Sequence, residues 1–354
     1  MKNKFLVGLL AFFSAILTTI LFLNYSNSDS KKDYSFDRKF SNNEILKFDN
    51  SYDLLSNDNS YQLFNSTGES IVEGKSIETE SKESQYDLFF SDGSFSNKIH
   101  KTLKLPDSNV LLIDKNHAIY SHEKNLYQLD LANNSSIKTT IKDINICSII
   151  SIDNIPNKYL FFGGAFLDKT YKTGFFVLDM LHNKIIESKI IQTDSVSYRL
   201  DTVTMYAGYF QKTVDKSLIY ICERNPMIFL FNKNGVLDGD LKTKDNTPMP
   251  KIIKNSKNMY FFSRDGSTYT NSGVFTDKEN LFVFSMASKL KDKIIIDQYS
   301  RKTKEYVQSF KLNYNNYNSN DIANVIIDKE KLILKFESNY ASFKFSRYTD
   351  GNFY

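Results

Sequence analysis

Short apolar runs recur along this chain at close intervals, separated by clusters of polar residues. From residue 41 onward the runs are rich in Ile, Phe, Tyr, Val and Leu, and the clusters are rich in Asn, Asp, Lys, Gly and Ser. Apolar spacing of the helical kind is scarce. Short β-branched and aromatic runs bounded by turn residues are typical of strands. The pattern predicts an all-β protein.

The runs form a repeat. Most units contain four runs, and the last contains three before the chain ends. The units cover about residues 109–141, 146–191, 201–242, 273–312 and 322–346. Four units share an Asp-Lys step between the first and second runs: Asp114-Lys115, Asp215-Lys216, Asp277-Lys278 and Asp328-Lys329. A repeated unit of four short strands predicts a β-propeller.

The N-terminal part of the chain supplies what the last unit lacks. QYDLFFSDG at 85–93 and NKIHKTLKL at 97–105 resemble the outer strands of one more unit, and NEILKF at 43–48 is free to complete the last sheet. A strand from the other end of the chain would close the ring and remove an exposed edge. We expect six four-stranded blades. Seven blades are the alternative number if residues 48–72 and 250–272 hold further strands. An open pair of β-sandwiches is the alternative fold.

One uncharged apolar block precedes the repeats. Phe5 to Leu23 covers nineteen residues, and as a helix it would span roughly 28 Å, close to a hydrocarbon core. Lys2 and Lys4 precede it, which places the N-terminus in the cytoplasm and the rest of the chain outside. We expect a cytoplasmic end at 1–4, a transmembrane helix at 5–23, a polar tether at 24–40 and a propeller at 41–354, on the periplasmic side of the cell membrane. The alternative is a cleaved signal segment and a secreted protein.

Charge and cysteine content bear on the possible partners and on the state of the thiols. The net charge is +4, from 45 basic and 41 acidic residues, and no basic run follows the first forty residues. No nucleic-acid partner is therefore expected. Cys147 and Cys222 each lie within an apolar run, where a buried free thiol is the common state. A disulfide between them stays open, because an oxidising compartment would permit one.

Several segments resemble a known family. DQYSRKTKEYVQSFKL at 297–312, NYASFKFSR at 339–347, YICERNPMIFLFNKNGVL at 220–237 and TKDNTPMP at 243–250 resemble six-bladed propeller proteins of Bacteroidota. These are described by their fold alone, as TolB-like or six-bladed propellers. The resemblance covers about residues 197–347 and implies the fold and a signal or anchor segment. It brings no catalytic residues.

No segment carries a recognisable reaction motif. H-E-x-x-H, closely spaced Cys and His, G-x-G-x-x-G, P-loop and G-x-S-x-G patterns are all absent from the sequence. The Asp-Gly pairs suit hairpin turns better than calcium loops. We predict no catalytic residue, no metal site and no cofactor.

One weak set of ligand-binding candidates is left. Asp201, Tyr206, Tyr209 and Arg224 lie in or beside the first two strands of the third unit, and Arg264 and Asp265 lie in a turn before the fourth. Inner strands and their loops line the centre of a propeller, and Arg and Tyr are favoured in binding sites. Blade packing is the alternative interpretation of these residues.

The functional expectation is accordingly coarse. We expect a membrane-anchored extracytoplasmic module that binds an unidentified envelope protein or small ligand. A propeller enzyme, whether a hydrolase, lyase or redox protein, is the alternative, because such sites assemble from several blades. A signalling subunit is a third hypothesis.

Overall fold

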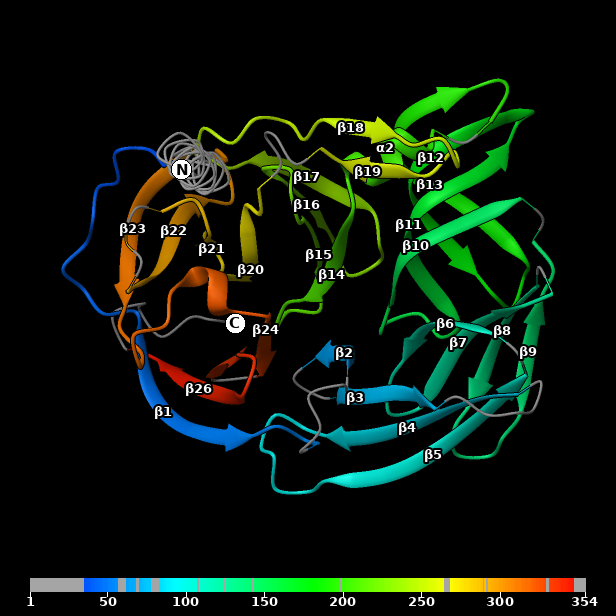
Figure 1. Ribbon diagram of the computed structural model, residues 1–354, viewed down its shortest axis with the longest axis horizontal. Coiled ribbons are helices and arrows are strands. Elements are labelled where there is room, and N and C mark those ends of the chain that lie inside the picture. The colour runs from blue at the N-terminus through cyan, green and yellow to red at the C-terminus, as the bar shows by residue number, and fades with distance from the viewer. Residues whose placement is uncertain are drawn as a thin grey trace, which may run out of the picture. The chain divides into compact units, whose positions relative to one another are not determined.

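Strands dominate the computed structural model (Figure 1). It describes residues 35–56, 62–67, 70–77, 83–106, 108–123, 125–141, 143–197, 199–263, 268–288, 290, 292–328 and 331–346. These residues form six antiparallel four-stranded sheets and one two-stranded hairpin. The all-β propeller with six four-stranded blades is therefore confirmed.

Blades 1 to 3 follow the chain order. Blade 1 contains β2 (Gln62–Thr67), β3 (Ser70–Ile77), β4 (Glu83–Ser91) and β5 (Ile99–Pro106). Blade 2 contains β6 (Asn109–Ile113), β7 (His117–His122), β8 (Asn125–Asp130) and β9 (Ser136–Thr139). Blade 3 contains β10 (Ile144–Ser151), β11 (Lys158–Leu167), β12 (Thr170–Asp179) and β13 (Lys184–Asp194).

Blades 4 to 6 complete the set. Blade 4 contains β14 (Gly208–Lys212), β15 (Leu218–Cys222), β16 (Met227–Phe231) and β17 (Leu237–Lys242). Blade 5 contains β20 (Asn271–Thr276), β21 (Asn280–Ser285), β22 (Ile294–Ser300) and β23 (Tyr306–Leu312). Blade 6 contains β24 (Asn324–Asp328), β25 (Lys331–Lys335), β26 (Asn339–Phe345) and β1 (Leu46–Asp53).

The first strand of each blade lies towards the centre of a closed ring (Figure 1). β6 contacts β2 and β10, and β24 contacts both β20 and β2, which joins the last blade to the first. β1 pairs with β26 from Leu46↔Phe345 to Asp53↔Asn339, so the N-terminal strand forms the outer edge of the C-terminal blade. This confirms the predicted closure by residues near 43–48.

A buried carboxylate stabilises the closure of the ring. Glu73 in blade 1 is almost fully buried. It accepts hydrogen bonds from the backbone N–H groups of Leu55 (3.0 Å) and Ser56 (3.2 Å), which connect β1 to β2. It also accepts one from the Tyr340 hydroxyl (2.6 Å) and pairs with Lys335, both in blade 6. The first and last blades are thus joined by polar contacts, in addition to the pairing of β1 with β26 inside blade 6.

The core is divided among the blade interfaces. Six clusters of buried apolar residues occur in the described chain, one between each pair of neighbouring blades. The packing of β15 on both of its faces explains why its sequence is apolar throughout. Leu218, Tyr220 and Cys222 pack towards blade 3, whereas Ile219 and Ile221 pack towards blade 5. A strand covered on both faces needs no polar alternation.

The Asp-Lys steps close the turns between first and second strands. Asp114 Oδ1 accepts from the N–H groups of Asn116 (2.8 Å) and His117 (2.7 Å). Asp277 Oδ1 accepts from those of Glu279 (2.8 Å) and Asn280 (2.6 Å). The side chain replaces the missing strand partners in the turn, which explains why Asp recurs there.

Within the described residues, three features lie outside the blades. They are α2 (Leu200–Met205), the hairpin of β18 (Ile252–Lys254) and β19 (Tyr260–Phe262), and a 3-10 turn, η1 (Ser319–Asp321). The hairpin accounts for strands within 250–272, and it makes no seventh blade. The run at 201–206 was expected to begin a strand but forms a helix, because one turn there buries Thr202 and Val203 and places Asp201 at the favourable N-terminal end.

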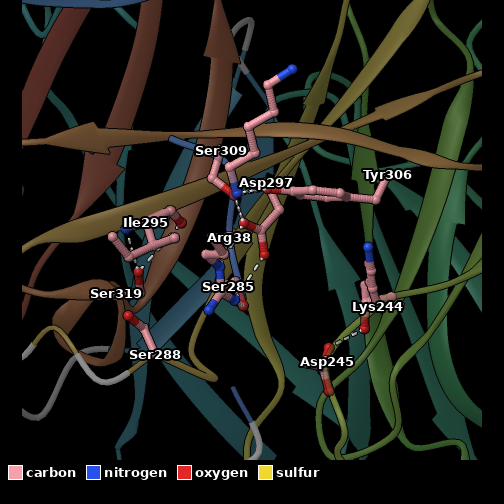
Figure 2. Close-up of polar contacts among 12 residues, drawn as sticks. Arg38, Lys244, Asp245, Ser285, Ser288, Ile295, Asp297, Tyr306, Ser309 and Ser319 are labelled. Carbon is pink, nitrogen blue, oxygen red and sulfur yellow. Dashed lines mark hydrogen bonds and ion pairs between the residues drawn. The ribbon is translucent and has the colours of Figure 1, made fainter. Parts of the chain in front are cut away.

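The segment before β1 is docked on blade 5 (Figure 2). Phe40 pairs with Ser309 of β23, and the Arg38 guanidinium binds Asp297 through Nε–Oδ1 (2.8 Å) and Nη2–Oδ2 (3.0 Å). The Ser309 hydroxyl donates to the same carboxylate (2.6 Å). The compact unit begins at Ser35, so the last six residues of the expected tether belong to the propeller.

The expected membrane segment at 5–23 lies outside the described residues, as do residues 1–34 in full. Within the described part of the chain, no helix is long and apolar enough to cross a membrane.

The two thiols differ in burial. Both are free, and Cys222 is buried as expected. Cys147 was expected to be buried but is exposed on β10, where a bulge between Ile146 and Ser148 interrupts pairing with β11. The protein that surrounds this sulfur still desolvates the thiolate and raises the pKa of Cys147 to about 11.

Candidate functional site

The predicted candidates in α2 and β14 are largely engaged within the fold. Asp201 binds the neighbouring Arg199 guanidinium at 2.7 and 3.1 Å, and these hydrogen bonds lower the pKa of the Asp201 carboxyl. Tyr206 packs against the core between blades 3 and 4, and Tyr209 against the core between blades 4 and 5. Desolvation raises the pKa of both phenols, far more for Tyr209. A binding role for these residues stays a prediction.

Arg224 lies in the turn between β15 and β16. Its guanidinium carbon is 4.9 Å from the ring centroid of Phe262 and 4.2 Å from that of Tyr269. Stacking of this kind fixes the planar group between two aromatic faces. Arg224 therefore holds the hairpin of β18 and β19 against blade 4. Arg264 and Asp265 lie outside the described residues.

The described candidates share one end of blade 4. Neighbouring strands are antiparallel, so the connection into the first strand and the turn between the second and third lie at the same end of each blade. α2 lies in the connection into β14, and Arg224 lies in the turn between β15 and β16. These segments therefore lie at one end of blade 4, and Asp201 pairs with Arg199 instead of another candidate.

A cavity of about 690 Å³ opens at the same end of the neighbouring blades 2 and 3. It is formed by the start of β6, the turn between β7 and β8, and the connection from β9 to β10. Seven of its ten lining residues are polar, and Leu126, Ile141 and Ile144 supply apolar surface. The polar lining residues are Ser108, Asn109, Ser121, His122, Glu123, Asn125 and Asp143.

The lining residues make mostly local contacts. The Asn125 amide donates to the Glu123 carbonyl (3.1 Å), and His122 Nε2 lies 3.9 Å from Glu123 Oε1. The Ser121 hydroxyl donates to the Asn109 carbonyl (3.5 Å). The Ser108 hydroxyl oxygen differs, because it is buried and has no hydrogen-bond partner among the described residues. A buried hydroxyl without a partner costs free energy that a ligand could recover.

Sequence reasoning missed this cavity. His122 lies in no recognisable motif, and the other lining residues are common turn and strand-end types. They come from three separate connections, and no motif links them. Only the blade arrangement brings them together. Within the described residues, no group of His, Cys, Asp and Glu could hold a metal ion.

Comparisons with known proteins identify no family for this chain. No protein-family model and no curated protein matches the chain in sequence. Similar solved structures include a member of the DUF4221 family from Bacteroides vulgatus, with 9% identity over 86% of this chain and 99% of that chain and a TM-score of 0.43. A streptogramin B lyase has 9% identity over 85% and 98% of the two chains and a TM-score of 0.36. Regucalcin from Agrobacterium tumefaciens, a calcium-binding protein, has 8% identity over 86% and 97% and a TM-score of 0.35.

These similarities are too distant to transfer a ligand or an activity. Membership of the Bacteroidota propeller family stays a prediction.

Proposed function

We propose that this chain is a membrane-anchored extracytoplasmic propeller that binds a small polar ligand in the cavity between blades 2 and 3. The observation that carries the proposal is the cavity itself. Its volume of about 690 Å³ falls within the range of roughly 300–1,000 Å³ that small-molecule sites occupy. The apolar block at 5–23 supports the location.

The lining favours recognition by hydrogen bonds. Ser108 before β6, and His122 and Asn125 at the turn between β7 and β8, offer donors and acceptors, and the buried Ser108 hydroxyl has no partner in the described chain. A ligand hydroxyl or carbonyl placed beside it would restore the missing hydrogen bond. We therefore expect a ligand rich in hydroxyl, amide or carbonyl groups, which the rest of the ring positions on a rigid scaffold.

The test is a thermal-shift screen of sugars, nucleosides and amino acids against the purified protein. A ligand that binds only the folded state raises the melting temperature by mass action. We expect a hit whose affinity falls by up to about tenfold in Ser108→Ala, the usual contribution of one hydrogen bond. Asn125→Leu should weaken the same compound.

Ser135→Ala is the matched control. Ser135 lies in the turn between β8 and β9, at the other end of blade 2, where its backbone N–H donates to Asn133 and its carbonyl accepts from Asp130. It should bind the compound as the wild type does. A screen without a hit, or equal loss in Ser108→Ala and Ser135→Ala, would rule out ligand binding in this cavity.

A further inference from the structure

The hairpin of β18 and β19 presents apolar side chains to solvent. Ile253 and Phe261 are cross-strand partners and are 47% and 43% exposed, and Met259 beside them is 47% exposed. Apolar residues grouped in this way on a short projecting hairpin indicate an interaction surface. We call Ile253, Met259 and Phe261 the hairpin patch.

The hairpin patch faces away from the propeller. Phe262 pairs with Ile252 and lies under the Arg224 guanidinium, so that side of the hairpin is turned towards blade 4. Side chains alternate along a strand, and Ile253 and Phe261 therefore point the other way. The tip is ordered by Asn255, whose side chain accepts from the N–H groups of Lys257 (3.0 Å) and Met259 (2.9 Å). The patch is thus held rigidly in an outward position.

Positive charge lies close to the hairpin patch. Lys251, Lys254 and Lys257 are all exposed. The sequence from Asn246 to Ser263 contains these three lysines and no acidic residue. Exposed apolar side chains on a hairpin with exposed lysines match the two components of an anionic membrane surface, the acyl boundary and the charged headgroups.

A side-chain contact links the segment before this hairpin to the start of the compact unit. Asn246 donates from Nδ2 to the Ser35 carbonyl (3.1 Å), and the Arg38–Asp297 ion pair fixes the segment that follows. Ile252 is six residues beyond Asn246, so the hairpin begins within roughly 22 Å of Asn246, which contacts Ser35. Residues 24–34 link the expected membrane segment to Ser35, and these eleven residues reach at most about 40 Å.

We propose that the β18–β19 hairpin is a membrane-docking element that inserts the hairpin patch into the headgroup region of an anionic lipid surface. The anchor would hold the propeller close to the membrane, and the hairpin would give it a second contact and a fixed orientation. The proposal rests on the membrane location proposed above and is independent of the cavity.

A tryptophan probe tests this directly, because the chain has no Trp. The unit from Ser35 to Tyr354 contains every described strand and all six cores, so it can be studied without residues 1–34. Phe261→Trp places the single fluorophore in the patch. Its emission should shift to the blue with vesicles of phosphatidylcholine and phosphatidylglycerol, but not with phosphatidylcholine alone. Ile99→Trp, an exposed position on β5 of blade 1, is the control and should show no shift.

A charge variant tests the electrostatic part. Each lysine near an anionic surface contributes about 1 kcal/mol, so replacing Lys251, Lys254 and Lys257 together by Gln should reduce partition to the anionic vesicles on the order of 100-fold. High salt should have the same effect on the wild-type unit. Ile253→Ser should weaken partition while leaving its salt dependence in place.

Three results would overturn membrane docking. They are an unchanged Phe261→Trp emission with anionic vesicles, an equal shift in Ile99→Trp, and partition that survives loss of the three lysines. Concentration-dependent self-association that Phe261→Asp abolishes, without vesicle binding, would assign the patch to a second copy of the chain. The vesicle assay uses the unit without residues 1–34, so it tests the hairpin alone. Fractionation of the full chain with membranes tests the proposed anchor. Either test can fail while the other succeeds.

Discussion

Arg38 and Asp297 show how single residues fix the N-terminal segment. Their side chains are only 4% and 2% exposed, and removal of two charges from water costs several kcal/mol for each ion. The cost is offset by two direct contacts, by the Ser285 hydroxyl beside Arg38 (3.0 Å) and by the Ser309 hydroxyl on Asp297. The phenol of Tyr306 contacts Ser309 (2.7 Å) and extends the network. Every member supports the docked position of residues 35–41.

Replacing Asp297 should therefore release this segment. In Asp297→Ala the Arg38 guanidinium loses its carboxylate while still buried, and we expect the free energy of unfolding to fall by about 3 kcal/mol. Urea denaturation would measure the change. Limited proteolysis should also cut the variant within residues 35–41, because undocking is the way for Arg38 to regain water.

Asp292→Ala is the matched control, since Asp292 pairs with Lys293 at the surface and is 63% exposed. Its unfolding transition should coincide with that of the wild type. A loss in Asp292→Ala equal to that in Asp297→Ala would show that the buried pair has no special role.

At the scale of elements, β1 is the strand that completes the ring. It covers the outer edge of β26 and buries Ile45 and Leu46 in the core between blades 5 and 6. Without it, β26 would present a row of unpaired backbone N–H and C=O groups, which invites pairing with other chains. The same strand leads directly into the contacts around Glu73.

Two truncations distinguish the role of β1 in closing the ring from the proposed role of residues 1–34 in membrane anchoring. Removal of residues 1–34 leaves the compact unit intact, and the product should elute as a single species in size-exclusion chromatography. Removal of residues 1–53 deletes β1 and should give soluble oligomers or precipitate with a lower melting temperature. The closure argument is wrong if both truncated proteins are monodisperse and melt together.

The sequence predicted the blades well because burial on both faces makes their strands conspicuous. Runs such as LIYIC and NLFVFS are continuous and apolar, and the Asp turns repeat at fixed places. α2 was missed because its Thr and Val residues favour strands locally, while tertiary packing of Val203 selects one helical turn. β18 and β19 are three residues each, too short for their pattern to identify a hairpin.

The candidate cavity could not be predicted for a different reason. Ser108, His122 and Asp143 lie in three connections far apart in the sequence, and each residue type is ordinary at a strand end. Their proximity depends on the angle between blades 2 and 3, which is set by apolar packing elsewhere. The angle between the blades cannot be derived from the composition or periodicity of the sequence.

At the scale of the whole molecule, six interfaces of similar construction make a ring in which each blade supports its neighbours. The described unit has one apolar cluster for each interface, and the ring is joined through β1 and Glu73. Such a ring is a stiff platform, so loops at its ends can hold a cavity on one side and a projecting hairpin on another. Stiffness also means that contacts at two points suffice to orient the whole unit.

The last prediction concerns where this unit lies. Lys2 and Lys4 before the apolar block at 5–23 predict that the propeller is exported. Alkaline phosphatase, which is active only outside the bacterial cytoplasm, should be active when fused after Tyr354 and inactive when residues 5–23 are deleted. If the segment is uncleaved, the fusion should stay with the membrane after alkaline carbonate extraction, because a spanning helix resists treatments that remove surface-bound proteins. Release into the soluble fraction would indicate cleavage, and an inactive full-length fusion would place the propeller in the cytoplasm and contradict the orientation.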